Sequence, residues 1–122
     1  IDVEHIRSIT EADQIVNSFF SDYEKKVYHN LPPHQKQVAF FNCWTRKEAL
    51  IKAIGEGLAL PLDSFDVSLT PGEPARLLGI NSDEASKRWS LHNLTFDHNY
   101  AVALAIEGND WKLSCWEWKE KV

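Results

Sequence analysis

A single long helical segment, predicted from about His34 to Ile54, constrains the fold of this 122-residue chain more than any other feature. The pair Pro32-Pro33 favours a helix start just after it, and Gly55 is placed to close the helix in a left-handed conformation. A chain of this length is one domain with a real core and is too short for two. The helix is therefore expected to be the main cover of that one core.

Charged residues lie inside this otherwise apolar helix. Each helical residue turns by about 100°, so Trp44, Glu48 and Lys52 share one stripe, while Lys47 points between apolar side chains on another side. A carboxylate among aromatic groups is costly to desolvate unless a cation, a metal or hydrogen bonds compensate it. The simplest explanation is an ordinary helix pair of Glu48 with Lys52, worth about 0.2 to 0.5 kcal/mol.

The other segments predict two short helices before the long one and mostly strands after it. Thr10 can cap a helix that runs to about Phe20, and Ser21 with Glu24 forms a capping box that opens a second helix. Alternation of polar and apolar residues predicts strands at 1–6, 65–69, 75–78, 89–95, 100–106 and 112–118, with a short helical insert at 82–87. Short connections favour antiparallel pairing. The expected fold class is α+β, with an antiparallel sheet packed against the long helix.

The composition excludes several classes of protein. Hydrophobic residues make up 43% and charged residues 25%, and no apolar run approaches the ~20 residues that span a bilayer, so we expect no membrane partner. The 13 basic and 18 acidic side chains give a net charge of -5 without a Lys/Arg cluster, which argues against nucleic acid as a partner. Two cysteines, Cys43 and Cys115, do not make a disulfide framework and fit a cytoplasmic location.

The first strand carries two carboxylates that point to the same face, Asp2 and Glu4. This spacing alone is a weak signal, because acidic residues commonly occupy the wet face of a sheet. Glu48 on a helix packed against the strand could add a third carboxylate, as a metal ligand or as a base. Hard oxygen ligands suit Mg²⁺, which usually takes one or two carboxylates together with water and substrate phosphate. Lys47 and Lys52 would then be placed to meet phosphate oxygens as point charges.

Three stretches together resemble a known family: IDVE, FFSDYE and WTRKEALIKAIGEGLALPLDSFDVSL. They are similar to the C-terminal half of a 4′-phosphopantetheinyl transferase of the large, surfactin-synthetase-activating type. The most specific part is W-x-x-K-E-x-x-x-K followed by G-x-G-L and P-L-x-x-F. The likeness covers residues 1 to about 69 well and the later strands more loosely. It implies that residues 1–122 form a single 4′-phosphopantetheinyl transferase-like half-domain, with the N-terminal half absent.

The resemblance implies a reaction and a site. The reaction would transfer 4′-phosphopantetheine from coenzyme A to a serine of an acyl or peptidyl carrier protein, releasing adenosine 3′,5′-bisphosphate. By matching positions, Asp2, Glu4 and Glu48 would gather Mg²⁺ on the coenzyme A pyrophosphate. Glu48, directly or through water, would take the serine proton, and Lys52 would offset charge on the leaving group. Lys47 belongs to the same motif, with phosphate contact and internal pairing both open.

Two departures from the family pattern affect this expectation. Members of the large type are pseudo-dimers of two related halves with the catalytic pocket between them, and the glycine expected before Ile1 is missing here. The chain also lacks methionine, so we expect a preceding segment. We therefore predict an incomplete active site, completed by an N-terminal half-domain or by a second copy of the chain. The alternative is a non-catalytic module that binds coenzyme A or a carrier protein.

Two further residues lie close to the predicted site. Glu24 matches a family glutamate in the F-x-x-x-E segment, although its capping-box role explains it fully. His5 adjoins the acidic motif and is the histidine to watch as an outer contact of the metal ligands.

Overall fold

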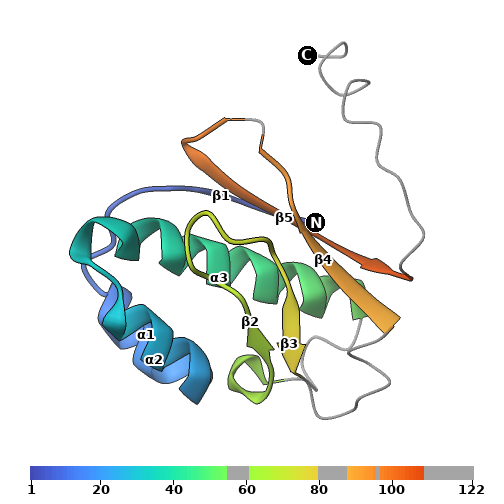
Figure 1. The fold of residues 1–122 in the computed structure, drawn as a ribbon, viewed down its shortest axis with the longest axis horizontal. Coiled ribbons are helices and arrows are strands. Elements are labelled where there is room, and N and C mark those ends of the chain that lie inside the picture. The colour runs from blue at the N-terminus through green and yellow to red at the C-terminus, as the bar shows by residue number, and fades with distance from the viewer. Residues whose placement is uncertain (55–60, 80–87, 96, 109–122) are drawn as a thin grey trace.

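The computed structural model describes residues 1–54, 61–79, 88–95 and 97–108 (Figure 1). Its elements, in chain order, are β1 (Asp2–His5), α1 (Ala12–Phe19), α2 (Asp22–Asn30), α3 (Pro33–Ile54), the 3-10 helix η1 (Leu62–Ser64), β2 (Asp66–Val67), β3 (Leu77–Gly79), β4 (Trp89–Asn93) and β5 (Tyr100–Glu107). The expected closure of the long helix at Gly55, the helical insert at 82–87 and the strand at 112–118 lie outside the described residues.

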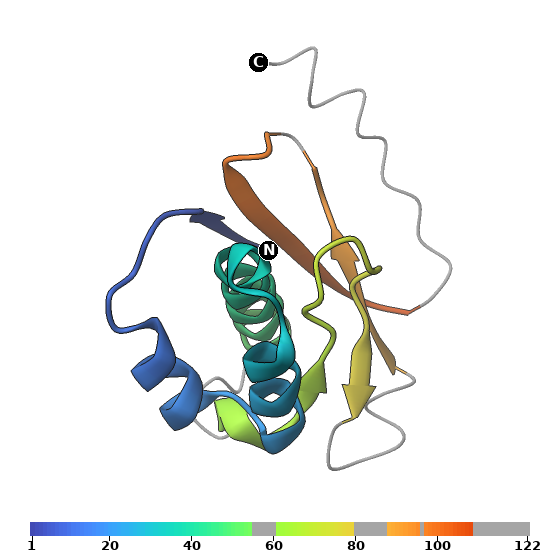
Figure 2. The same ribbon diagram turned by 60° about the vertical axis from the view of Figure 1, so that its left-hand side comes forward.

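The described strands form two antiparallel sheets. The larger sheet has the order β1-β5-β4, so the first strand pairs with the last described one, and β2 pairs with β3 separately. Helix α3 runs along one face of the larger sheet, while α1 and α2 lie on another side of α3 (Figures 1 and 2). The predicted α+β fold with a long helix over an antiparallel sheet is confirmed.

Small side chains on β5 let α3 approach the sheet closely. Ala101, Ala103 and Ala105 alternate along the strand and are buried in the core. In the β1 ladder, Asp2 lies opposite Ala103 and Glu4 opposite Ala101. Both carboxylates therefore belong to the face of the sheet that α3 covers.

The first helix begins differently from the prediction. Its N-cap is Glu11, whose side chain makes no capping hydrogen bond, so the expected Thr10 cap is wrong. The chain enters α1 through a turn instead, in which the Ala12 amide donates to the Ile9 carbonyl. The capping box of Ser21 at the start of α2 is confirmed.

The strand predicted at 65–69 is reduced to the two residues of β2. The carbonyls just after it are taken by side chains of α3. Arg46 Nη1 donates to the Ser68 carbonyl at 2.6 Å, and Asn42 Nδ2 donates to the Leu69 carbonyl at 3.3 Å. A longer β2 ladder would have to compete with these contacts. In the part of the chain that the structure describes, no helix is long and apolar enough to span a membrane.

The capping box gives a test of how strongly the start of α2 is held. Ser21→Ala removes the hydroxyl that accepts from the Glu24 amide at 3.3 Å and should lower the free energy of unfolding by about 1 kcal/mol. Ser18→Ala on the exposed side of α1 is the matched control and should stay within about 0.5 kcal/mol of the wild type. Urea unfolding measures both, and equal stabilities of the two variants would show that the cap contributes nothing.

Candidate functional site

A buried ion pair lies beside the candidate site. Lys47 on α3 is 1% exposed and Glu24 on α2 is fully buried, and Lys47 Nζ lies 2.9 Å from Glu24 Oε1. Burial raises the pKa of the Glu24 carboxyl, and the charge of Lys47 opposes this rise. Two backbone amides also donate to this carboxylate, from Ser21 at 2.8 Å and from Val67 at 2.7 Å. One carboxylate thus joins α2, α3 and β2.

The Lys47 ammonium has no donor left for a ligand. Besides Glu24 it donates to the carbonyls of Leu62 and Phe65, and it lies 3.9 Å from the centre of the Phe65 ring. An ammonium has three N–H donors, and all three are used here. Of the two roles that the sequence left open for Lys47, the structure favours internal pairing. The contacts of Lys47 therefore support a role in holding α3 in place, not a contact with coenzyme A.

The next charged residues of α3 face a different environment. Lys52 Nζ donates to Asp2 Oδ1 at 2.6 Å, with the Asp2 side chain 7% exposed and the Lys52 side chain 54% exposed. This hydrogen bond to Asp2 raises the pKa of Lys52. Among the described residues Lys52 forms this ion pair with β1, not the expected helix pair with Glu48.

Glu48 completes a cluster of charges at the junction of β1 and α3. Burial raises the pKa of its carboxyl, the negative charges of Asp2 and Glu4 raise it further, and Lys52 lowers it. Three carboxylates and one ammonium are thus close enough to influence one another. The side chain of Glu48 is partly accessible, so it can reach a bound molecule while still being less readily ionised than a free glutamate.

Glu4 also borders an aromatic hollow between β1 and α3. A cavity of about 280 Å³ is lined by Glu4 with Phe40, Phe41 and Trp44, and Arg7 forms part of its wall. Arg7 lies over the Phe41 ring at 5.3 Å and donates to the His5 carbonyl. The carboxylate of Glu4 therefore stands between the charge cluster and an apolar surface.

The donor set fits a hard divalent cation only in part. No three His, Cys, Asp or Glu side chains of the described ranges lie close enough to hold one metal ion together. However, Asp2 Oδ2 is buried and has no hydrogen-bond partner, which leaves one carboxylate oxygen free to accept. Mg²⁺ usually takes one or two protein carboxylates and completes its shell with water and phosphate. Asp2 and Glu48 carry carboxylate oxygens of the kind that Mg²⁺ prefers, and Glu4 lies on the same face of the sheet.

The sequence did not predict how deeply Glu24 and Arg46 are buried. Glu24 is more than a capping residue, because it pairs with Lys47 and binds Val67. Arg46 is 2% exposed and bonded to Ser68, and burial lowers its pKa to about 10, so it stays charged at neutral pH. His5 faces away from the carboxylates, and its ring packs 5.1 Å from that of Tyr100.

Comparison with known proteins identifies the family. The model of the 4′-phosphopantetheinyl transferase superfamily matches residues 1–105. The chain is 36% identical over 118 residues to the 4′-phosphopantetheinyl transferase HetI of Nostoc sp., covering 97% of this chain and 47% of that protein. It is 41% identical over 69 residues to a 4′-phosphopantetheinyl transferase of Bacillus subtilis, covering 57% of this chain and 30% of that protein.

A more distant relative is the human L-aminoadipate-semialdehyde dehydrogenase-phosphopantetheinyl transferase, 28% identical over 110 residues, with 84% of this chain and 36% of that protein covered. The chain belongs to the 4′-phosphopantetheinyl transferase superfamily. It spans less than half the length of these relatives.

The buried pair gives a second test of stability. Lys47→Met leaves Glu24 without its cation and should cost about 3 to 5 kcal/mol in the free energy of unfolding. The double variant Lys47→Met with Glu24→Gln should lose less free energy of unfolding than the sum of the losses in the two single variants, because the residues interact directly. Urea unfolding of the four proteins measures this coupling.

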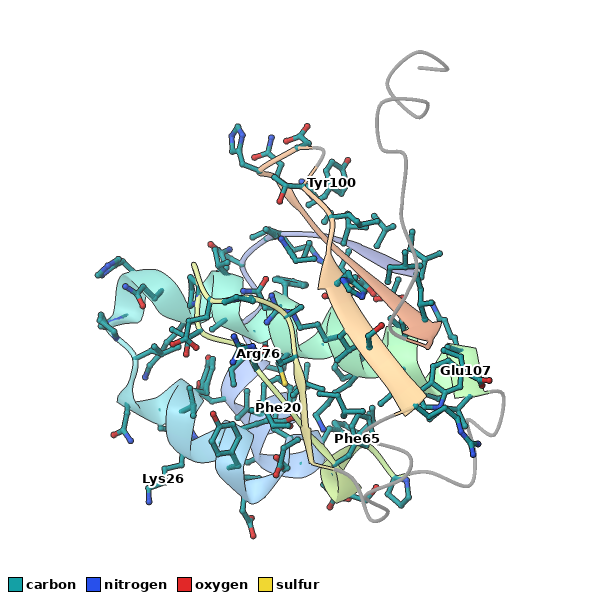
Figure 3. The ribbon with its side chains drawn as sticks, turned by 45° about the vertical axis from the view of Figure 1, so that its right-hand side comes forward. Phe20, Lys26, Phe65, Arg76, Tyr100 and Glu107 are labelled. Carbon is teal, nitrogen blue, oxygen red and sulfur yellow. The ribbon has the colours of Figure 1, made fainter. Side chains whose placement is uncertain are left out.

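The control for this cycle is Lys26→Met, at an exposed position that projects from α2 (Figure 3), where the change should stay within about 0.5 kcal/mol. Additive costs, or a Lys47→Met protein as stable as this control, would contradict a tight internal pair.

Proposed function

We propose that this chain carries the metal-binding and proton-accepting residues of a Mg²⁺-dependent 4′-phosphopantetheinyl transferase. The reaction transfers the phosphopantetheine of coenzyme A to a serine hydroxyl of an acyl or peptidyl carrier protein of fatty acid, polyketide or nonribosomal peptide synthesis. The observation that carries the proposal is the cluster of Asp2, Glu48 and Lys52 at the junction of β1 and α3, in a chain of this superfamily.

Glu48 is the proposed base. Its raised pKa brings the carboxyl closer to the pH at which it works, which favours both accepting and releasing a proton. Its partial exposure allows the carrier serine to approach it directly or through one water molecule.

Asp2, Glu4 and Glu48 are the proposed metal ligands. Asp2 offers a buried carboxylate oxygen that lacks a hydrogen-bond partner, and it is held in place by its ladder with β5. Mg²⁺ bound by these residues would stabilise negative charge on the pyrophosphate oxygens. Lys52 has an exposed side chain long enough to place its ammonium near the departing adenosine 3′,5′-bisphosphate.

The charge of the site supports completion by another unit. Lys52 is the cation that the described residues bring to three carboxylates, whereas coenzyme A itself carries several phosphate charges. Further cations from outside this cluster would therefore be needed to hold the nucleotide. Since this chain spans 47% of the Nostoc relative, we propose that an N-terminal half-domain or a second copy of the chain supplies them.

A second candidate is a non-catalytic module that binds coenzyme A or a carrier protein. It is favoured by the absence of a three-carboxylate metal group within the described ranges. Such a module would bind coenzyme A in calorimetry without modifying any carrier. For both candidates we propose a cytoplasmic location, in keeping with the free thiol of Cys43.

Mass spectrometry of a carrier protein tests the proposed reaction. The chain, with and without the N-terminal half of the Nostoc relative, is incubated with coenzyme A, Mg²⁺ and an apo carrier, and the mass gain of the carrier is followed. Glu48→Gln should slow the gain by about 10²- to 10⁴-fold, because it removes the base. Glu73→Gln, an exposed change on the β2–β3 loop, should react like the wild type.

Two outcomes would contradict the proposal in different ways. Full activity of the Glu48→Gln protein, with its fold verified by circular dichroism, would refute the base and ligand roles of Glu48. No mass gain under either condition, together with coenzyme A binding in calorimetry, would favour the non-catalytic module.

A further inference from the structure

The ammonium of Lys52 occupies the position beside Asp2 where a bound metal ion would lie. Lys52 Nζ lies 2.6 Å from Asp2 Oδ1, so the cation already sits on the carboxylate proposed to hold the metal. The other oxygen, Asp2 Oδ2, is buried and has no hydrogen-bond partner. The Asp2 carboxylate is therefore only half satisfied by the ammonium.

The charges around this pair are unbalanced. The carboxylates of Asp2, Glu4 and Glu48 together with one ammonium, that of Lys52, leave a formal charge of -2. Like charges at short range are costly. A doubly charged cation in place of the ammonium would leave a formal charge of -1 instead of -2.

The two partners differ in their freedom to move. Asp2 lies in β1, where its backbone is fixed opposite Ala103 of β5, and its side chain is 7% exposed. Lys52 lies near the end of α3, and its side chain is 54% exposed and carries a flexible four-carbon stem. Of the two groups, Lys52 is the one that can leave.

We propose that Lys52 is a built-in counter-ion, which occupies the cation position at Asp2 and moves away when a divalent cation binds there. This inference rests on the proposed function, because it assumes that Asp2 is a metal ligand. The Lys52 side chain then leaves Asp2 and moves to the solvent-facing side of the cluster. A phosphate of coenzyme A would be bound on that side. The same ammonium thus stabilises the cluster before the metal binds and the substrate afterwards.

Displacement of Lys52 has a consequence for the order of binding. While Lys52 is paired with Asp2, one of its three N–H donors is used by this carboxylate, and the ammonium is held beside β1. Once the divalent cation takes over Asp2, Lys52 becomes free for the nucleotide. Binding of metal and binding of coenzyme A should therefore favour each other, each making the other tighter by the same factor.

Metal affinity tests this inference without any measurement of activity. Mn²⁺ binding to the full chain is titrated by electron paramagnetic resonance of the free ion, at 0.15 M salt to screen distant charges. Lys52→Met keeps the apolar stem but removes the competing ammonium, and it should bind Mn²⁺ about tenfold more tightly than the wild type. The matched control is Lys36→Met, which removes the same charge from the start of α3, where Lys36 lies over the Tyr28 ring; its affinity should not change.

The outcomes separate this inference from the proposed function. If the wild type and Lys52→Met bind Mn²⁺ with equal affinity, the metal site stands and displacement of Lys52 is refuted. If neither protein binds Mn²⁺, the proposed metal site itself fails, and the inference fails with it. If Lys52→Met and Lys36→Met increase the affinity for Mn²⁺ equally, the effect comes from the change in net charge alone, and displacement is also refuted.

A measurement on the wild type covers the case in which Lys52→Met does not fold. The ammonium resonance of Lys52 is followed by ¹H–¹⁵N NMR, with Lys36 as the internal reference. Addition of Mg²⁺ should shift or broaden the Lys52 signal, since its hydrogen bond to Asp2 is lost, and should leave the Lys36 signal in place. An unchanged Lys52 signal at saturating Mg²⁺ would overturn the proposal.

Discussion

The direction in which Glu48 and Lys52 point from α3 depends on the buried ion pair of Lys47 with Glu24. Lys47 is held by a carboxylate of α2 and by two carbonyls of the segment after α3, so α3 cannot rotate about its axis without breaking these contacts. A buried pair is costly to form but more costly to break, because either partner alone would be an uncompensated charge. The pair therefore fixes the rotation of the helix more firmly than apolar contacts, which tolerate small shifts.

Helix geometry transmits this constraint to the next residues. Glu48 follows Lys47 by about 100° around the helix, and Lys52 lies one turn beyond Glu48 on the same stripe. With Lys47 turned toward α2 and β2, Glu48 and Lys52 are directed toward β1, where Asp2 meets them. In the motif K-E-x-x-x-K, the first lysine, Lys47, is buried and orients the helix. The following Glu48 and Lys52 face the carboxylates of β1. The two lysines carry the same charge, but only Lys52 is accessible.

The sequence predicted those parts of the fold that follow from local patterns. The long helix, the capping box at Ser21 and the antiparallel strands were predictable because periodicity and turn residues specify them within a few positions. The pairing of β1 with β5 was not, since it joins the two ends of the described chain and no local pattern encodes it. For the same reason the sequence left Lys47 with two roles, and it offered a helix pair with Glu48 as the simplest explanation of Lys52 beside the catalytic role that the family resemblance implied. Both lysines have their carboxylate partners in distant segments, Glu24 and Asp2.

The charges inside α3 also explain why the helix has no simple apolar face. Arg46 and Lys47 are adjacent and both buried, and each donates to backbone carbonyls of the chain that follows the helix, at Ser68 and at Phe65. These carbonyls lie beside the short strand β2, where the hydrogen bonds of the sheet do not reach them. A buried carbonyl without a hydrogen-bond donor would be costly. Cations of α3 therefore replace the missing strand partner. An apolar residue at either position would leave a carbonyl unpaired, so the polar pattern of the helix follows from the shortness of β2 as much as from the proposed function.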